Sequence, residues 1–184
     1  MGKYGDTSTD VTVYADYNQF YLGDSLFDAN TDEGFWTDEA LERKFAISYP
    51  SLIGVGTTYQ GNIPVVIEVC TEEPADDDLA VWDRVVEGSL SIPSAAVAVG
   101  GCMEYIPEIQ YRNALTQGAG DRVRRSPHIA VDPGTYRVRV YAGGIDTERI
   151  TEVDGELIEA CDEHYRIVMW PAPYRKPHVL YTRA

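Results

Sequence analysis

Residues 135–141, Thr-Tyr-Arg-Val-Arg-Val-Tyr, decide the fold class because apolar and polar side chains alternate along them. A period of two residues is typical of a half-buried β-strand. The turn signal Pro133-Gly134 comes directly before the stretch. We therefore predict a strand with Tyr136, Val138 and Val140 facing a core. The polar face expected to meet solvent consists of Thr135, Arg137, Arg139 and Tyr141.

The same period recurs on both sides of this stretch. Further strands are expected at residues 10–22, 63–70, 82–92, 95–99, 165–170 and 179–182. Along 82–92 one face should hold Trp82, Val86, Leu90 and Ile92. The opposite, solvent-facing side should hold Asp83, Glu87, Ser89 and Ser91. Asp154-Gly155 predicts a tight hairpin turn.

One helix is expected, near residues 37–46. Thr37 suits an N-cap, and acidic residues follow it in the first turn, where the helix dipole favours them. Trp36 and Leu41 have the spacing of a hydrophobic staple. Many short strands with one helix and no βαβ rhythm predict a mainly-β protein, a single-domain antiparallel β-sandwich with one short α-helix near residues 37–46.

The length of 184 residues fits one domain covering residues 1–184. Residues 1–9 are polar and should be frayed. Residues 105–127 lack a clear period and should form a long loop or insertion, and they hold four arginines: Arg112, Arg122, Arg124 and Arg125. No apolar run approaches the roughly 20 residues that span a bilayer, and the N-terminus lacks an apolar signal core. A cytoplasmic protein without membrane contact is expected.

Three cysteines, Cys70, Cys102 and Cys161, are widely spaced and form no C-x-x-C pair. The odd count favours thiols in a reducing cytosol, although one disulfide with one free thiol is an alternative.

Net charge is the strongest global signal, at −15. Residues 1–83 hold 17 acids and 3 bases, whereas residues 84–184 hold 13 acids and 12 bases. Such a field repels nucleic-acid phosphates and anionic membranes and attracts basic partners. The alternative is that the acids only maintain solubility.

No catalytic, cofactor or metal motif is present in the sequence. There is no G-x-S-x-G and no P-loop, and His128, His164 and His178 lack metal-ligand spacing. Asp76-Asp77-Asp78 offers oxygen atoms to calcium but lacks the spacing of an EF-hand loop, so a solvated charge run is favoured. A protein without enzymatic activity, cofactor or metal is expected.

Two short motifs in order go beyond composition. Tyr17-Asn18-Gln19-Phe20 is followed by Trp36-Thr37-Asp38-Glu39-Ala40-Leu41-Glu42 and then Phe45-Ala46. This order and spacing resembles the competence protein J family, the DNA-entry nuclease inhibitors. The similarity runs from about Val11 to Val69 and resumes at Asp132-Pro133-Gly134-Thr135-Tyr136. The resemblance implies a small, acidic, intracellular protein that restrains a competence nuclease by binding it, and it transfers no inhibitory residue.

The resulting hypothesis is a non-catalytic acidic protein that covers the cationic site of a basic partner such as a nuclease, without binding nucleic acid itself. The candidate partner-binding residues are Asp24, Asp28, Asp32, Glu33, Glu72, Glu73, Asp76, Asp77 and Asp78. The alternative is a β-sandwich that binds a small ligand, calcium or carbohydrate. A third possibility is an enzyme of unrecognised type.

Overall fold

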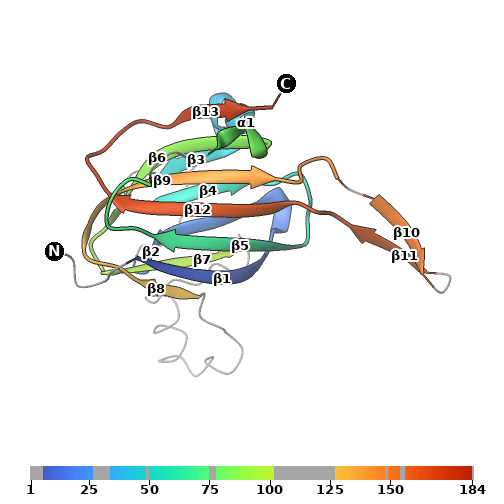
Figure 1. The fold of residues 1–184 in the computed structure, drawn as a ribbon, viewed down its shortest axis with the longest axis horizontal. Helices are drawn as coiled ribbons and strands as arrows, with labels where there is room; N and C mark the ends of the chain where they lie inside the picture. Colours follow the sequence, from blue (N-terminus) through green and yellow to red (C-terminus); the bar gives the residue numbers. More distant parts are fainter. Residues whose placement is uncertain are drawn as a thin grey trace.

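The computed structural model describes residues 6–26, 34–48, 50–74, 78–101, 127–147, 149–153 and 156–183. The fold is mainly β, with two sheets packed face to face and a separate hairpin (Figure 1). Sheet A contains, in spatial order, β1 (Thr7–Tyr14), β5 (Asn62–Val69), β12 (His164–Pro171), β9 (Gly134–Gly143), β6 (Arg84–Ile92) and β13 (His178–Thr182). Sheet B contains β3 (Phe45–Ser48), β4 (Leu52–Gly56), β2 (Gln19–Asp24), β7 (Ala96–Gly101) and β8 (His128–Ala130). The hairpin is formed by β10 (Arg149–Val153) and β11 (Glu156–Ala160).

Among the described residues, the strands pair antiparallel with one exception. β12 runs parallel to β5, and Tyr165 lies opposite Val65. On its other side β12 pairs antiparallel with β9. The prediction of a mainly-β sandwich is confirmed, and the parallel pair is an addition to the expected antiparallel pattern.

The main core lies between the two sheets and is built from the inward residues of both. Phe20 and Phe45 of sheet B and Ile167 of sheet A are fully buried in it. Gly88 in β6 allows the sheets to approach, because a Cβ atom there would lie 2.5 Å from Ile47 Cδ1. The inward positions predicted from the period of two, Tyr136, Val138 and Val140, belong to this core.

The expected solvent face of sheet A is covered. Arg137 is 7% exposed and Arg139 is 9% exposed, so the prediction that they face water is wrong. The alternation itself is correct, but Val85, Tyr141, Val168 and Trp170 form a second apolar cluster on this outer face. Residues before β6 and after β12 pack against that cluster. Trp82 is one of them, so it does not share the face of Val86 as expected.

The helix α1 (Asp38–Arg43) is shorter than predicted. Thr37 is its N-cap, as expected, and its hydroxyl accepts a hydrogen bond from Ala40 N at 3.2 Å. The helix ends because Lys44 adopts the left-handed conformation, with φ 55°, and Phe45 begins β3. Leu41 is 51% exposed, and the Trp36 ring packs edge-on against Phe35, so the expected staple is not what fixes the helix.

The strand expected at 10–22 is two strands in different sheets. A 3-10 turn, Asp16–Asn18, carries the chain from β1 in sheet A to β2 in sheet B. Tyr17 and Asn18 have φ values of 51° and 56° there. β1 begins at Thr7, which pairs with Val69, so the fraying expected as far as residue 9 is also wrong.

The structure confirms the predicted hairpin, but other predictions concern residues that it does not describe. β10 and β11 pair with Val153 opposite Glu156, which confirms a hairpin around Asp154-Gly155. Cys70 and Cys161 are not in a disulfide, and Cys102 lies outside the described residues. The predicted loop at 105–127 lies outside them apart from Pro127. Within the described chain, no helix is long and apolar enough to cross a bilayer.

Candidate partner-binding surface

Four of the nine predicted partner-binding residues lie in the described part of the chain. They are Asp24, Glu72, Glu73 and Asp78. The other five, Asp28, Asp32, Glu33, Asp76 and Asp77, fall outside it.

Asp24 is a buried residue at the end of β2, where it pairs with Val97 of β7. It is 2% exposed, and its carboxylate accepts hydrogen bonds from Leu26 N and Ser94 N, both at 2.9 Å. These bonds tie the end of β2 to the turn between β6 and β7. The prediction that Asp24 faces a partner does not fit this burial, and we leave it out of the candidate surface.

Glu72, Glu73 and Asp78 remain at the surface, on the segment between β5 and β6. Glu73 keeps 64% of its side chain exposed although it forms an ion pair with Arg139 at 2.8 Å. Asp78 accepts a hydrogen bond from Ala80 N at 3.1 Å and so caps a 3-10 turn, Leu79–Val81. Glu72 is exposed. These three residues are exposed to solvent.

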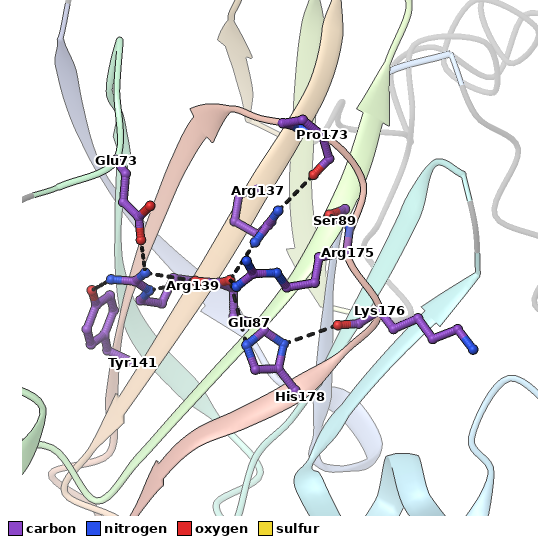
Figure 2. A network of polar contacts seen from close by, with 10 residues as sticks. All are labelled: Glu73, Glu87, Ser89, Arg137, Arg139, Tyr141, Pro173, Arg175, Lys176 and His178. Atoms are coloured by element: carbon purple, nitrogen blue, oxygen red, sulfur yellow. Dashed lines mark hydrogen bonds and ion pairs between the residues drawn. The ribbon is translucent and has the colours of Figure 1, made fainter.

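A buried carboxylate organises the outer face of sheet A beside them (Figure 2). Glu87 is 1% exposed. It accepts hydrogen bonds from Arg137 Nη1 at 2.9 Å and from Arg139 Nε at 2.9 Å. His178 Nε2 lies 3.8 Å from the same carboxylate, and Arg175 lies 3.5 Å away.

The C-terminal segment closes over this network. Arg137 Nη2 donates to Pro173 O at 2.8 Å, and Arg175 N donates to Ser89 Oγ at 2.9 Å. The chain then enters β13, which pairs with β6 at the edge of sheet A. Figure 2 shows the side chains meeting between β6, β9 and this segment. The buried charges therefore fasten the C-terminus to the sheet.

Burial raises the pKa of Glu87, but hydrogen bonds and positive charge from Arg137 and Arg139 outweigh it, so this pKa lies below its ordinary value. Burial lowers the pKa of Arg139, and contacts with Tyr141 and Glu87 more than reverse this, so the guanidinium remains charged. The network is a compensated ion cluster. Its charged groups pair with one another, so the network stabilises sheet A and holds the C-terminal segment in place.

A second buried carboxylate lies where β11 leads into β12. Glu163 is 2% exposed and accepts hydrogen bonds from Tyr59 N at 2.7 Å and Tyr165 Oη at 2.6 Å. Thr58 N donates to it as well, at 3.0 Å. Burial and the negative charge of Glu163 hold the pKa of Tyr165 well above its ordinary range. This cluster joins the turn after β4 to the start of β12.

A groove of about 420 Å³ separates α1 from β13. It has no dominant sign of charge, because two carboxylates and two guanidinium groups line it. Its lining residues are Glu39, Glu42, Arg43, Arg84, Pro177, His178, Val179 and Thr182. In the described chain, no group of three His, Cys, Asp or Glu side chains lies close enough to hold a metal ion.

These features define a class of protein: a mainly-β sandwich with buried ion clusters in structural positions. No protein-family model matches the chain, and no curated protein matches it in sequence. Its fold is similar to that of ComJ from Bacillus subtilis, an inhibitor of the DNA-degrading activity of NucA. The TM-score is 0.60 at 12% identity, covering 92% of this chain and 100% of ComJ. A second solved structure, crocagin biosynthetic gene J, has a TM-score of 0.54 at 17% identity with the same coverage.

The resemblance drawn from residues 17–20 and 36–46 is thus confirmed at the level of the fold. Both motifs have structural positions in it. Phe20 is fully buried and contacts Tyr165 edge-on, with 5.2 Å between ring centroids, and Thr37 caps α1. The motifs therefore specify how sheet B and the helix pack.

Proposed function

We propose that this protein is a non-catalytic binding protein of the cytoplasm that restrains a nuclease by covering its basic site. The observation that carries the proposal is the fold shared with ComJ over 92% of the chain. ComJ inhibits a DNA-degrading activity, and an inhibitor needs a rigid scaffold rather than catalytic groups.

The proposed mechanism is electrostatic attraction between the protein and the nuclease. A nuclease must hold phosphates, so its cleft presents cations. A chain of net charge −15 is attracted to such a cleft, and its carboxylates compete there with DNA. Among the described residues, Glu72, Glu73 and Asp78 are the predicted carboxylates that remain at the surface.

In this proposal the side chains on the surface, rather than the fold, determine which partner the protein binds. Crocagin biosynthetic gene J shares the architecture, and one fold can carry several functions. The test of the proposal therefore measures nuclease inhibition directly.

The experiment adds the purified protein to NucA and follows the degradation of plasmid DNA at low and high salt. Stoichiometric protection at low salt, weakened by salt, is the expected result. A variant with Glu72→Gln, Glu73→Gln and Asp78→Asn should associate more slowly at low salt and equally at high salt. The matched control removes three exposed acids elsewhere, by Asp10→Asn, Glu39→Gln and Glu42→Gln.

Two outcomes would count against the proposal. Absence of protection and of binding at low salt rejects inhibition of a NucA-type nuclease. Equal association of the variant and the control at low salt removes Glu72, Glu73 and Asp78 from the interface.

A further inference from the structure

Arg84 places a positive charge on the core-facing side of a strand. It is the first residue of β6, and Val86 and Leu90, further along the same strand, belong to the main core. Because side chains alternate along a strand, Arg84 lies on the same face as Val86 and Leu90. Arg84 is half-buried, and in the described part of the chain it has no hydrogen bond or ion pair. A partly buried cation without a counter-charge is unfavourable, so a further partner is expected.

Two more cations lie beside Arg84 where the sandwich opens. Arg43, Lys44 and Arg84 line a small inner cavity between the two sheets, and the described residues around it include no carboxylate. The free space in this cavity is about 10 Å³, about the room that one water molecule needs. Like charges repel one another, so gathering these three side chains costs free energy unless an anion accompanies them.

The buried carboxylate behind this cavity has partners of its own. Tyr165 lines the cavity, and its hydroxyl donates to Glu163 at 2.6 Å. Glu163 also accepts hydrogen bonds from the backbone of Thr58 and Tyr59. Burial and Glu163 raise the pKa of Tyr165, and the positive charge of Arg84 opposes them, so Arg84 lies close to this phenol. Glu163 is therefore a hydrogen-bonded structural group, and within the described chain it forms no ion pair with the three cations.

Arg43 is held in place by the backbone. Its Nε donates to Phe45 O at 2.7 Å, and its side chain is 19% exposed. Glu39 is its ion-pair partner at 3.7 Å, but this carboxylate is 88% exposed, so water screens the pair. The guanidinium therefore has a fixed orientation and keeps donors for another group. A donor that is already fixed loses little conformational entropy when it binds.

The groove between α1 and β13 leads to the two arginines. Figure 1 shows these elements together at one side of the sandwich, and the groove volume of about 420 Å³ is within the roughly 300–1,000 Å³ of small-molecule sites. Arg43 and Arg84 line both the groove and the inner cavity, so they lie where the two meet. Glu39 and Glu42 line only the groove, and both are exposed. The groove thus has cations at its inner end and acids at its rim.

We infer that this groove binds a small organic anion, with a carboxylate or phosphate group between Arg43 and Arg84 and an apolar part against β13. Arginine presents a planar fork of donors that matches the oxygen atoms of both anions. Pro177 and Val179 line the wall formed by β13 and the residue before it, and Val179 is 46% exposed, so an apolar group finds contacts there. The acids at the rim repel a large polyanion such as nucleic acid, which favours a ligand small enough for the groove to enclose. The inference does not require the proposed nuclease partner.

The test titrates the full chain with phenyl phosphate and with benzoate at constant ionic strength. Calorimetry measures affinity and stoichiometry, and NMR follows the Nε–H signals of Arg43 and Arg84. We expect saturable one-to-one binding of at least one probe, with both arginine signals shifted, and the tighter probe identifies the preferred oxyanion. Benzyl alcohol has a similar ring without the charge and should bind at least about tenfold more weakly.

A pair of variants separates the site from the general charge of the protein. Arg84→Gln should weaken binding of the tighter probe about tenfold. Its melting temperature should stay within about 2 °C of the unmodified protein, because the Arg84 charge has no ion pair to lose in the described chain. The matched control, Lys176→Gln, removes an exposed charge that does not line the groove and should bind within about twofold of the unmodified protein.

Three results would each overturn the inference: no saturable binding of either probe, unshifted Arg43 and Arg84 signals at saturation, or equal weakening by Arg84→Gln and Lys176→Gln. Equal affinity for benzyl alcohol and the charged probes would exclude an anion site as well. If Arg84→Gln fails to fold, the arginine signals of the unmodified protein still decide the matter, because they report on the site without any substitution.

Discussion

Glu87 and Arg139 form a two-point ion pair on a buried face of sheet A, with Arg139 Nε and Nη2 at 2.9 and 2.8 Å from Glu87 Oε2. Both residues come from adjacent strands, β6 and β9, where they are register partners. The pair lies under the C-terminal segment, so it links the interior of the sheet to the last residues of the chain.

Removing the Glu87 charge should destabilise the protein strongly. Glu87→Gln leaves Arg137 and Arg139 buried without this counter-charge, and the expected loss is about 3 kcal/mol in the free energy of unfolding. Urea denaturation at neutral pH measures it. The control is Glu39→Gln, which removes a 3.7 Å pair with Arg43 whose carboxylate is 88% exposed, and it should cost less than about 1 kcal/mol. Equal losses of unfolding free energy in the two variants would show that the buried pair stabilises the protein no more than the exposed pair.

The same carboxylate should make stability depend on acid pH. Its pKa in the folded state lies below the ordinary value of 4.5, so its contribution is present above pH 4.5 and is lost as pH falls through the folded pKa. The difference in urea midpoint between the unmodified protein and Glu87→Gln should therefore shrink on acidification. A difference that stays constant down to the acid transition would contradict this assignment.

Tyr165 should make the stability of the fold decrease at alkaline pH. Its pKa is raised well above 10.0, so the unfolded chain loses this proton first, and stability is full below pH 10 and declines above it. The difference in tyrosinate absorbance between the unmodified protein and Tyr165→Phe isolates this phenol. We expect no ionisation of Tyr165 until the protein unfolds. Ionisation of this residue near pH 10 in the folded state would count against its bond to Glu163.

Two glycines provide a matched test of the hairpin base. Gly144→Ala places a methyl group against Asp162 O in a left-handed conformation and should cost more than about 1 kcal/mol. Gly134→Ala meets its nearest atom, Tyr136 Cε2, at 3.9 Å, and should be within about 0.5 kcal/mol of neutral. Thermal unfolding of both variants decides the matter. Indistinguishable melting temperatures would mean that the close approach at Gly144 is not required.

The sequence could predict those strands in which apolar and polar residues alternate without interruption. Residues 63–69 and 135–141 alternate cleanly, and both are strands with the predicted face in the core. It could not predict the burial of Arg137, because the group that covers it, Pro173 O, is 36 residues away. Local alternation identifies two faces, but only tertiary structure decides whether the second face meets water.

Local sequence could not show which of the predicted partner-binding carboxylates lie at the surface. Aspartate is a common residue in surface loops, yet the Asp24 carboxylate is buried and accepts hydrogen bonds from two backbone amides. Averaging charge over residues 84–184 concealed the density of acids around the predicted hairpin, because residues 146–163 hold eight acids and one base whereas the rest of that half has five acids and eleven bases. A count by segment would have shown that these acids surround the hairpin turn predicted at Asp154-Gly155.

The position of β12 has a consequence for synthesis on the ribosome. β12 lies between β5 and β9, so until residues 164–171 emerge, sheet A exists only as two unconnected halves, β1–β5 and β6–β9. A nascent chain at that stage exposes open strand edges, which favour aggregation. Sheet A can therefore close only after residues 164–171 have left the ribosome, and chaperone protection matters most during the interval before they appear.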